Sequence, residues 1–360
     1  MSGSDLTRAL VWLSASENLT ARGRRLLMEA HGDPACALKG FSASARSLVG
    51  EKAYAELRAA ADTLDARISR LDALGIAALT QEDADFPDRL KTIPDAPELL
   101  YVKGHIRPRP TVAIVGSRRD TRYGREQTQR IARELAEAGV TVVSGLARGI
   151  DTAAHRGAVQ AKGVTVGVLG CGLDMVYPQE NAPLAEEILR LGGALVSEYP
   201  PGTAPLPYHF PRRNRMISGL ADGVLLIEAT LRSGTQSTIN HALEQGRTVF
   251  ALPGNVDAPG SELPLQLLKD GAELCTCASD ILTRLRFPEC PATVASDSPA
   301  GTPPEDDPIL AALYREDKTF EELLEETGLP AQTLTARLGL LELDGRVDRL
   351  PGRAFALHHK

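Results

Sequence analysis

The sequence predicts an α/β protein with a doubly wound parallel sheet, an all-helical N-terminal domain and a C-terminal winged helix. Three observations lead to this prediction. From Thr111 onward, apolar and β-branched runs that end in glycine or a turn alternate with helical stretches. Before that point, leucine and alanine recur at helical spacing, and near the C-terminus three helical segments precede two short strands. A chain of 360 residues is long enough for about two or three domains.

Residues 1–78 are expected to form a domain of short helices. TARGRRLLMEA and EKAYAELRAAADTLDARISRL repeat leucine and alanine at three- and four-residue spacing. Gly32-Asp33-Pro34 is a turn signal between helices. The pattern predicts the fold of this domain and nothing about its purpose.

Residues 79–288 are expected to contain the parallel sheet. Its strands are the runs TVAIVG, VTVVSG, TVGVLG, ALVSE, GVLLIEA and TVFALPG. These runs are apolar on both faces, which is typical of strands buried in a parallel sheet, and the helices between them complete βαβ units.

Two further segments follow the sheet. Residues 289–307, within PECPATVASDSPAGTPPEDDP, are rich in proline, serine and acidic residues, which predicts a flexible linker. Residues 308–360 contain three helical patterns and two short strands around Pro351-Gly352. That arrangement predicts a winged helix-turn-helix.

The bulk properties restrict the function. A net charge of −7 excludes a uniformly basic protein, so any binding of nucleic acid must depend on a local group of arginines. The cysteines fall in no metal-ligand spacing and are expected to be reduced; they are Cys36, Cys171, Cys275, Cys277 and Cys290. We find no secretion signal and no apolar run near the length of a membrane span. These features predict a cytoplasmic protein without a metal, a cofactor or a membrane partner.

The loops after the predicted strands predict a binding site. The carboxyl ends of parallel strands meet at one edge of a sheet, and ligands bind there. Glycines in these loops let the backbone approach a ligand, and helix N-termini present free N–H groups to anions. Five arginines in these loops would reach the same edge: Arg118, Arg148, Arg213, Arg215 and Arg232. Their convergence predicts a site for more than one phosphate.

Known nucleotide motifs do not describe this edge. The first turn, GSRRDTRYG, lacks the G-x-G-x-x-G pattern of dinucleotide sites, and the chain has no G-x-x-x-x-G-K-[ST] loop for ATP. The edge is therefore not a dinucleotide site of the usual kind, and ATP hydrolysis by a P-loop is unsupported.

Other polar residues near this edge have two interpretations each. Asp151 and His155 are either a metal or acid–base pair, or a helix cap and a locally bonded histidine; the second is favoured because no third ligand or nucleophile is near in sequence. Glu198 and Glu228 are either acids or acceptors for backbone N–H groups. Asn214 either contacts a base or phosphate or caps its helix.

Five motifs occur in the order found in one known family. They are VAIVGSRRDTRYG, VVSGLARGIDTAAHRGA, VGVLGCGLDMVYPQEN, LVSEYPPGTAPLPYHFPRRNRMISGLADGVLLIEA and GRTVFALPG, preceded by DADFPDRLKTIPDAPELLYVKG. From about Asp83 to Asp280 the chain therefore resembles the DNA-processing protein A family, also called Smf, which acts in natural transformation. The resemblance implies an extended Rossmann-like sheet domain between a SAM-like helical domain and a winged helix.

The resemblance also implies a function. Members of the family bind and shield single-stranded DNA, load the RecA-type strand-exchange recombinase onto it, form homodimers and are not enzymes; single-strand-binding protein is a further candidate partner. The DNA pocket of the family corresponds here to Gly116, Ser117, Arg118, Ser144, Gly145, Arg213, Asn214, Arg215, Ser233 and Gly234. The predicted edge adds Arg119, Arg148, Arg212 and Arg232, and Phe210 as a base-stacking side chain.

Two segments depart from the family pattern. Ser233-Gly234-Thr235-Gln236-Ser237-Thr238-Ile239 replaces the usual S-G-S-L-I-T-A, and APGSELPLQLLKDGAEL lacks the usual segment with glycine, cysteine and asparagine. Both changes affect the wall of the pocket and leave the arginines in place.

The winged helix is weakly suited to reading duplex DNA. Residues 308–360 contain seven Lys/Arg and nine Asp/Glu, and the expected recognition helix, AQTLTARLGLLELDG, offers only Arg337. Duplex reading normally needs basic and polar side chains on that helix. Contact with protein, or with a second copy, is favoured.

Two other functions fit part of the pattern. RNRMISGLADGVLLIEATLRSGT is also similar to the nucleoside monophosphate phosphoribohydrolases, in which a glutamate follows Gly-Thr. Here Gly234-Thr235 precedes Gln236, so the group for acid–base help is missing. The other alternative is a nucleotide-sensing regulator that reads duplex DNA, and the apolar recognition helix argues against it.

Overall fold

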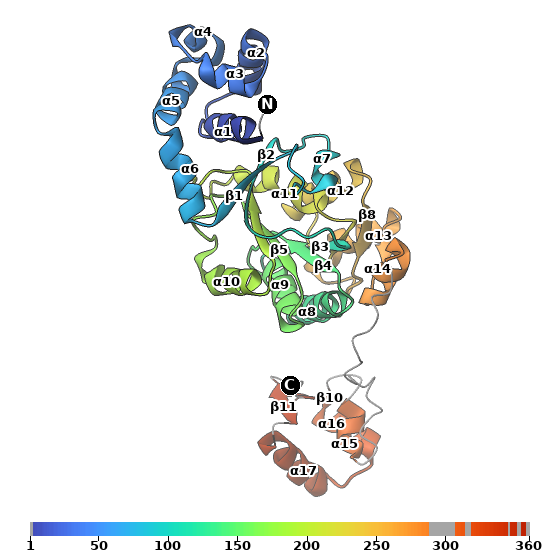
Figure 1. Cartoon of the computed structure of the whole chain (residues 1–360). Coiled ribbons are helices and arrows are strands. Elements are labelled where there is room, and N and C mark those ends of the chain that lie inside the picture. The colour runs from blue at the N-terminus through green and yellow to red at the C-terminus, as the bar shows by residue number, and fades with distance from the viewer. Residues whose placement is uncertain (1–2, 288–306, 314–317, 345, 351–353, 358–360) are drawn as a thin grey trace. The chain divides into compact units, whose positions relative to one another are not determined.

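The computed structural model describes residues 3–287, 307–313, 318–344, 346–350 and 354–357 (Figure 1). It consists of two compact units, Met1–Cys290 and Pro291–Lys360. The linker predicted at 289–307 and the turn at Pro351-Gly352 lie outside the described residues, apart from residue 307.

The described part of the first unit contains a nine-stranded sheet in the order β1-β2-β6-β5-β4-β3-β7-β8-β9. The strands from β6 to β9 in this order are parallel, and β1 and β2 extend one edge in antiparallel pairing. The doubly wound parallel sheet is therefore confirmed, and the sequence missed the antiparallel edge. The strands are β1 (Ile76–Thr80), β2 (Leu99–Gly104), β3 (Thr111–Val115), β4 (Thr141–Ser144), β5 (Thr165–Val168), β6 (Ala194–Ser197), β7 (Gly223–Leu226), β8 (Thr248–Ala251) and β9 (Glu273–Leu274).

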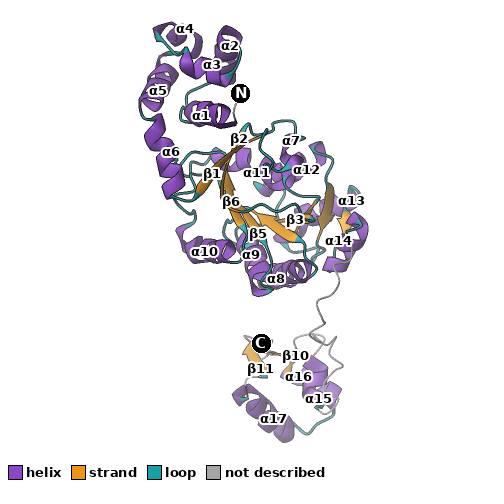
Figure 2. Cartoon of the chain, viewed as in Figure 1, coloured by secondary structure: helices purple, strands orange, loops and turns teal. Residues whose placement is uncertain are grey.

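Helices cover both faces of the sheet (Figures 1 and 2). Alternate residues of β3 point to opposite faces, so that Val112 and Ile114 join one apolar cluster while Ala113 and Val115 join the other. The first cluster contains side chains of α8 (Arg122–Glu137), α9 (Ile150–Gln160) and α14 (Ala278–Leu285). The second contains side chains of α7 (Asp88–Lys91), α11 (His209–Gly219), α12 (Thr235–Glu244) and α13 (Glu262–Lys269). Burial on both faces explains why the strands are apolar throughout.

The N-terminal helices pack against the antiparallel edge of the sheet. Trp12 is buried and donates its indole N–H to the Leu57 carbonyl oxygen over 2.8 Å, and the Tyr101 hydroxyl on β2 lies 2.7 Å from the Ser14 hydroxyl. One apolar cluster joins these helices to β1, β2, β6 and α10 (Ala182–Arg190). The helices are α1 (Gly3–Ser14), α2 (Ala21–His31), α3 (Pro34–Lys39), α4 (Arg46–Val49), α5 (Glu51–Asp62) and α6 (Leu64–Ala73).

The division of the first unit into domains at residues 1–78 and 79–288 remains a prediction, and its boundary lies within β1.

The second unit has the predicted winged-helix pattern. Its apolar core includes Leu323, Leu338 and Phe355. The sequence missed one short strand, β10, which makes a three-stranded sheet in the order β10-β12-β11. The elements are α15 (Pro308–Leu313), β10 (Lys318–Thr319), α16 (Phe320–Thr327), α17 (Ala331–Leu343), β11 (Val347–Leu350) and β12 (Ala354–Leu357).

The strand order creates a crevice beside β3. From β3 the chain proceeds outward through β4, β5 and β6, and then returns to β7 on the opposite side of β3. The connections that leave β3 and β7 therefore diverge. A crevice at such a switch point, beyond the carboxyl ends of the strands, is the usual ligand site of an open α/β sheet.

Candidate functional site

A cavity of about 860 Å³ occupies this switch point. Its walls come from the loops after β3 and β7, the first turns of α11 and α12, and the loop before α13. Nine of the residues predicted from sequence line it: Gly116, Ser117, Arg118, Arg119, Phe210, Arg213, Asn214, Ser233 and Gly234. The structure therefore brings segments from three separate βαβ units to one cavity.

The most distinctive side chain of the cavity is Arg213 on α11. Only 3% of this residue is exposed, yet its Nε and Nη1 atoms have no hydrogen-bond partner. Burial lowers the pKa of the guanidinium to about 10. The charge of Asp151 raises this pKa, and the charge of Arg118 lowers it. The guanidinium is therefore charged at neutral pH. A buried cation with two unused donors is unfavourable unless an anion accepts from it. The planar fork of arginine suits phosphate oxygens.

Gly145 provides the space for this guanidinium. A β-carbon at Gly145 would lie 1.8 Å from Arg213 Nη1 and 2.6 Å from Asp151 Oδ2. Only glycine leaves room for the Arg213 guanidinium at this position. Gly145 itself does not line the cavity.

Asp151 and His155 have structural hydrogen bonds, as the favoured interpretation expected. Asp151 Oδ2 accepts from the backbone N–H groups of Gly145 (3.1 Å) and Ala147 (3.3 Å), so it holds this loop; the expected helix cap is wrong. Burial raises the pKa of Asp151, and Arg213 opposes that shift. His155 Nδ1 lies 2.7 Å from Thr165 Oγ1, and burial lowers its pKa to about 3. The histidine is therefore neutral near pH 7.

An aromatic surface lies beside the arginines. The Phe210 ring centroid is 5.4 Å from Arg118 Cζ, 6.0 Å from Arg213 Cζ and 5.7 Å from the ring centroid of Tyr177. Phe210 is half-buried and lines the cavity together with the exposed Tyr177. Cations above an aromatic ring, next to an open face, provide both charge and a stacking surface.

The loop after β3 is fixed by its neighbours. Ser117 N–H donates to the Glu228 carbonyl oxygen over 2.6 Å, and the Glu228 carboxylate accepts from both the Thr121 N–H (2.9 Å) and the Thr121 hydroxyl. Gly124 is required because a β-carbon there would lie 2.3 Å from Glu228 Cδ. These bonds favour the structural interpretation of Glu228.

Asn214 joins α11 to α12. Its Nδ2 donates to Ser237 Oγ over 2.8 Å, and it lies inside α11, so it is not a helix cap. Next to it, Thr235 Oγ1 donates to the Gly116 carbonyl oxygen over 3.0 Å. The first bond connects α11 to α12, and the second connects the start of α12 to the loop after β3.

The other six predicted residues do not line the cavity. Arg148 pairs with Glu180 at 2.7 Å, and Arg215 pairs with Glu198 at 2.5 Å, and neither lines the cavity with Arg213. Their part in binding stays a prediction. The remaining residues are Ser144, which is buried and donates to the Ile114 carbonyl oxygen, Gly145, and the exposed Arg212 and Arg232.

Several lining residues were missed from the sequence. Tyr177, Pro205, Pro207 and Pro259 line the cavity, although none directly follows a strand. The only available signal was their place in long loops that leave the carboxyl ends of strands.

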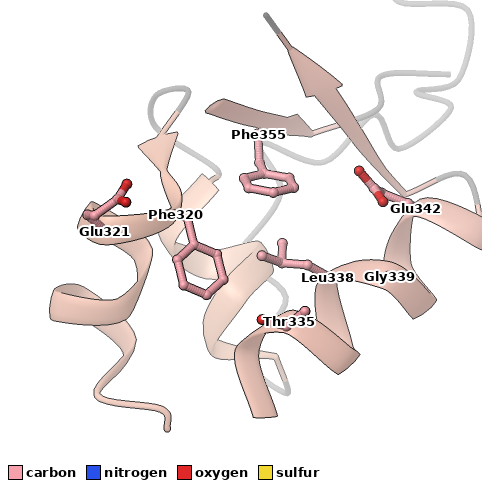
Figure 3. A pocket seen from close by; sticks show the side chains of 7 residues that line it. All are labelled: Phe320, Glu321, Thr335, Leu338, Gly339, Glu342 and Phe355. Atoms are coloured by element: carbon pink, nitrogen blue, oxygen red, sulfur yellow. The ribbon is translucent and has the colours of Figure 1, made fainter. Parts of the chain in front are cut away.

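The second unit has a pocket of about 360 Å³ between α16, α17 and β12 (Figure 3). Phe320, Leu338 and Phe355 form an apolar floor, and the carboxylates of Glu321 and Glu342 lie beside it. Glu342 Oε1 is buried without a hydrogen-bond partner. Phosphates are disfavoured in such a pocket.

Among the described residues there is no group of three or more His, Cys, Asp or Glu side chains that could hold a metal ion. In the described part of the chain, moreover, no helix has the length and apolar character to cross a membrane.

Comparisons with known proteins agree on one family. Residues 77–286 match the family model for DNA recombination-mediator protein A, and residues 293–353 match the DprA winged helix domain. Protein Smf of Escherichia coli K12 is 42% identical over 283 residues, which are 76% of each chain. The X-ray structure of DNA processing protein A from Streptococcus pneumoniae is similar, with a TM-score of 0.64 and 34% identity over 78% of this chain and 99% of that chain. A structure of the protein from Helicobacter pylori, described for its single-stranded DNA binding mode, has a TM-score of 0.53 and 31% identity over 59% of this chain and 95% of that chain.

Proposed function

Because this chain belongs to the DNA recombination-mediator protein A family, we propose that the cavity beside β3 binds the backbone of single-stranded DNA. The buried Arg213, with two donors that have no partner, is the observation that supports this most directly. A phosphodiester offers the anionic oxygens that this fork lacks. The similar structure from Helicobacter pylori, described for its single-stranded DNA binding mode, supports the same ligand.

The shape of the site favours an unpaired strand. A phosphate must enter a cavity to reach Arg213, and Phe210 beside it offers a ring for a base to stack on. Bases in a duplex are already stacked on one another, whereas unpaired bases are free to stack on a protein ring. A single strand can satisfy both contacts together.

The wider role is a proposal that rests on the family. We propose that the protein shields single strands in natural transformation or recombination, delivers them to a RecA-type recombinase, acts as a homodimer in the cytoplasm and has single-strand-binding protein as a further partner. Two cavities on one dimer would bind a strand more tightly than one, because the second contact becomes intramolecular.

We also propose that the protein is not an enzyme. The cavity contains two carboxylates, and Asp151 and Glu228 both accept hydrogen bonds from backbone N–H groups that fix their loops. Position 236, after Gly234-Thr235, carries glutamine where a phosphoribohydrolase would need an acid.

A salt titration tests the proposal. We expect the logarithm of the affinity for oligo-dT to fall with the logarithm of salt concentration by about 0.7 per phosphate contact. The double variant Arg118→Ala, Arg213→Ala should weaken binding and flatten this slope. Arg213→Met, which removes the charge but keeps much of the volume, should act in the same direction if the loss is electrostatic.

The matched control is Arg284→Ala, because Arg284 is an exposed arginine of α14 that pairs with Glu273 and does not line the cavity. Circular dichroism should show that each variant is folded. A folded double variant with unchanged affinity and slope would contradict the proposal.

For the winged helix we propose a protein contact instead of duplex reading. Arg337 is the only basic residue of α17, and its guanidinium donates to Asp307 over 2.9 Å. The pocket beside α17 presents Glu321 and Glu342 next to an apolar floor. Such a surface suits a basic and apolar protein segment better than phosphates.

A further inference from the structure

A second groove, of about 390 Å³, opens beside the cavity, and Arg118 lines both. It is lined by residues of α8 and α9, among them Arg125 and Arg156. The other lining residues are Asp120, Gln129, Arg148, Gly149, Thr152, Ala153, Glu180 and Asn181.

The groove carries an excess of positive charge. Four arginines and two carboxylates line it, although the whole chain has a net charge of −7. Arg125 pairs with Asp120 at 2.7 Å, and Arg148 pairs with Glu180 at 2.7 Å. Within the described ranges, neither Arg118 nor Arg156 has a carboxylate within 4.0 Å, so these two arginines carry the excess.

The groove and the cavity meet at a close backbone contact. Gly149 has φ of 75°, and a β-carbon on it would lie 2.3 Å from the Ser117 carbonyl oxygen and 3.0 Å from Arg118 Cα. Glycine therefore lets the start of α9 press against the loop after β3. Arg118, next to this contact, lines both the groove and the cavity.

The two sites differ in the ligand groups that they suit. Phe210 and Tyr177 line the cavity, whereas the described residues of the groove include no aromatic side chain. Arginines without a stacking surface suit phosphates and leave bases in solvent.

We propose that the groove binds phosphates of the same DNA strand next to the segment held in the cavity, with Arg118 at the junction. This inference rests on the proposed function of the cavity, and it adds an extended path for the strand along α8 and α9. Arg156 then contacts a phosphate only when the strand is long enough to extend from the cavity into the groove.

Glu180 is a competitor in this arrangement. Its two carboxylate oxygens accept from Arg148 Nε at 2.7 Å and Arg148 Nη2 at 2.9 Å, in a pair that is exposed to solvent. An arriving phosphate can replace this carboxylate on the same fork, because both anions fit the guanidinium in the same way. Glu180 therefore lowers affinity for long strands.

Oligo-dT strands of graded length test the proposal, over a range from about 3 to about 16 nucleotides. In fluorescence anisotropy, Arg156→Ala should leave affinity for the shortest strands unchanged and lower affinity for the longest by about two- to fivefold, as expected for one exposed ionic contact. The salt slope for long strands should decrease by about 0.7. Glu180→Gln should change long-strand affinity in the opposite direction.

Arg190→Ala is the matched control, because Arg190 is an exposed arginine of α10 that pairs with Glu187 outside the groove. If Arg156→Ala weakens binding equally at all lengths, or at none, the extended path is wrong. If the unmodified protein binds no strand of any length, the proposed function fails instead, so the two failures are distinguishable.

Discussion

Arg213 Nη1 occupies the space that a side chain at Gly145 would need, since a β-carbon there would lie only 1.8 Å away. Arg213 is buried, and it lines the cavity, so a side chain at Gly145 would force the guanidinium to shift from its present position. We therefore expect Gly145→Ala to displace the guanidinium and to weaken binding of oligo-dT by about tenfold or more. Overpacking of this kind should also reduce the free energy of unfolding by about 1–3 kcal/mol. Anisotropy and urea unfolding measure the two effects.

The control for Gly145→Ala is Gly339→Ala. Gly339 lies inside α17, and a β-carbon there would meet no atom within 4 Å. This substitution should stabilise the second unit by about 0.5–1 kcal/mol and leave binding of single strands unchanged. If the Gly145→Ala variant binds oligo-dT as tightly as the Gly339→Ala variant, binding does not depend on the present position of the Arg213 guanidinium.

The sequence predicted the sheet and the edge that carries the site because both follow from local patterns. The run TVAIV and its glycine turn specify a buried strand and the loop after it, whatever surrounds them. The final position of each arginine depends instead on distant partners. Arg148 pairs with Glu180, 32 residues away, and Arg215 pairs with Glu198, 17 residues away. No local pattern predicts such pairs, and for the same reason Tyr177 was missed as a lining residue.

Phe210 offers a separate test of stacking. Its ring lies beside Arg118 and Arg213 but carries no charge. Phe210→Ala should weaken binding by about 1–3 kcal/mol and leave the salt slope unchanged, because the number of phosphate contacts stays the same. Tyr208→Ala is the control, since Tyr208 is an exposed aromatic residue just before α11 that does not line the cavity. A flatter slope in Phe210→Ala would show that the ring acts by positioning the arginines.

His155 should make the stability of the first unit depend on pH. Burial lowers its pKa from 6.5 to about 3, so between these values the unfolded state binds a proton that the folded state does not. The free energy of unfolding therefore falls as pH decreases, by about 2 kcal/mol between about pH 7.5 and pH 5. Urea unfolding at both pH values should show this loss in the unmodified protein and a smaller loss in His155→Asn. Asp151 and Arg213 are present in both proteins and do not affect the difference. Equal losses in the two proteins would show that folding does not lower the pKa of His155.

Arg337 tests whether the winged helix reads duplex DNA. Its guanidinium already pairs with Asp307, and the pocket beside α17 is lined by Glu321 and Glu342. Duplex binding by a recognition helix normally loses about 1–3 kcal/mol when a base-contacting arginine is removed. We expect Arg337→Ala to leave both duplex and single-strand affinity of the full chain unchanged. Electrophoretic mobility shifts with a labelled duplex and with oligo-dT of equal length measure both. A loss confined to the duplex would overturn the protein-contact proposal, because it would require α17 to leave its ion pair and enter a groove.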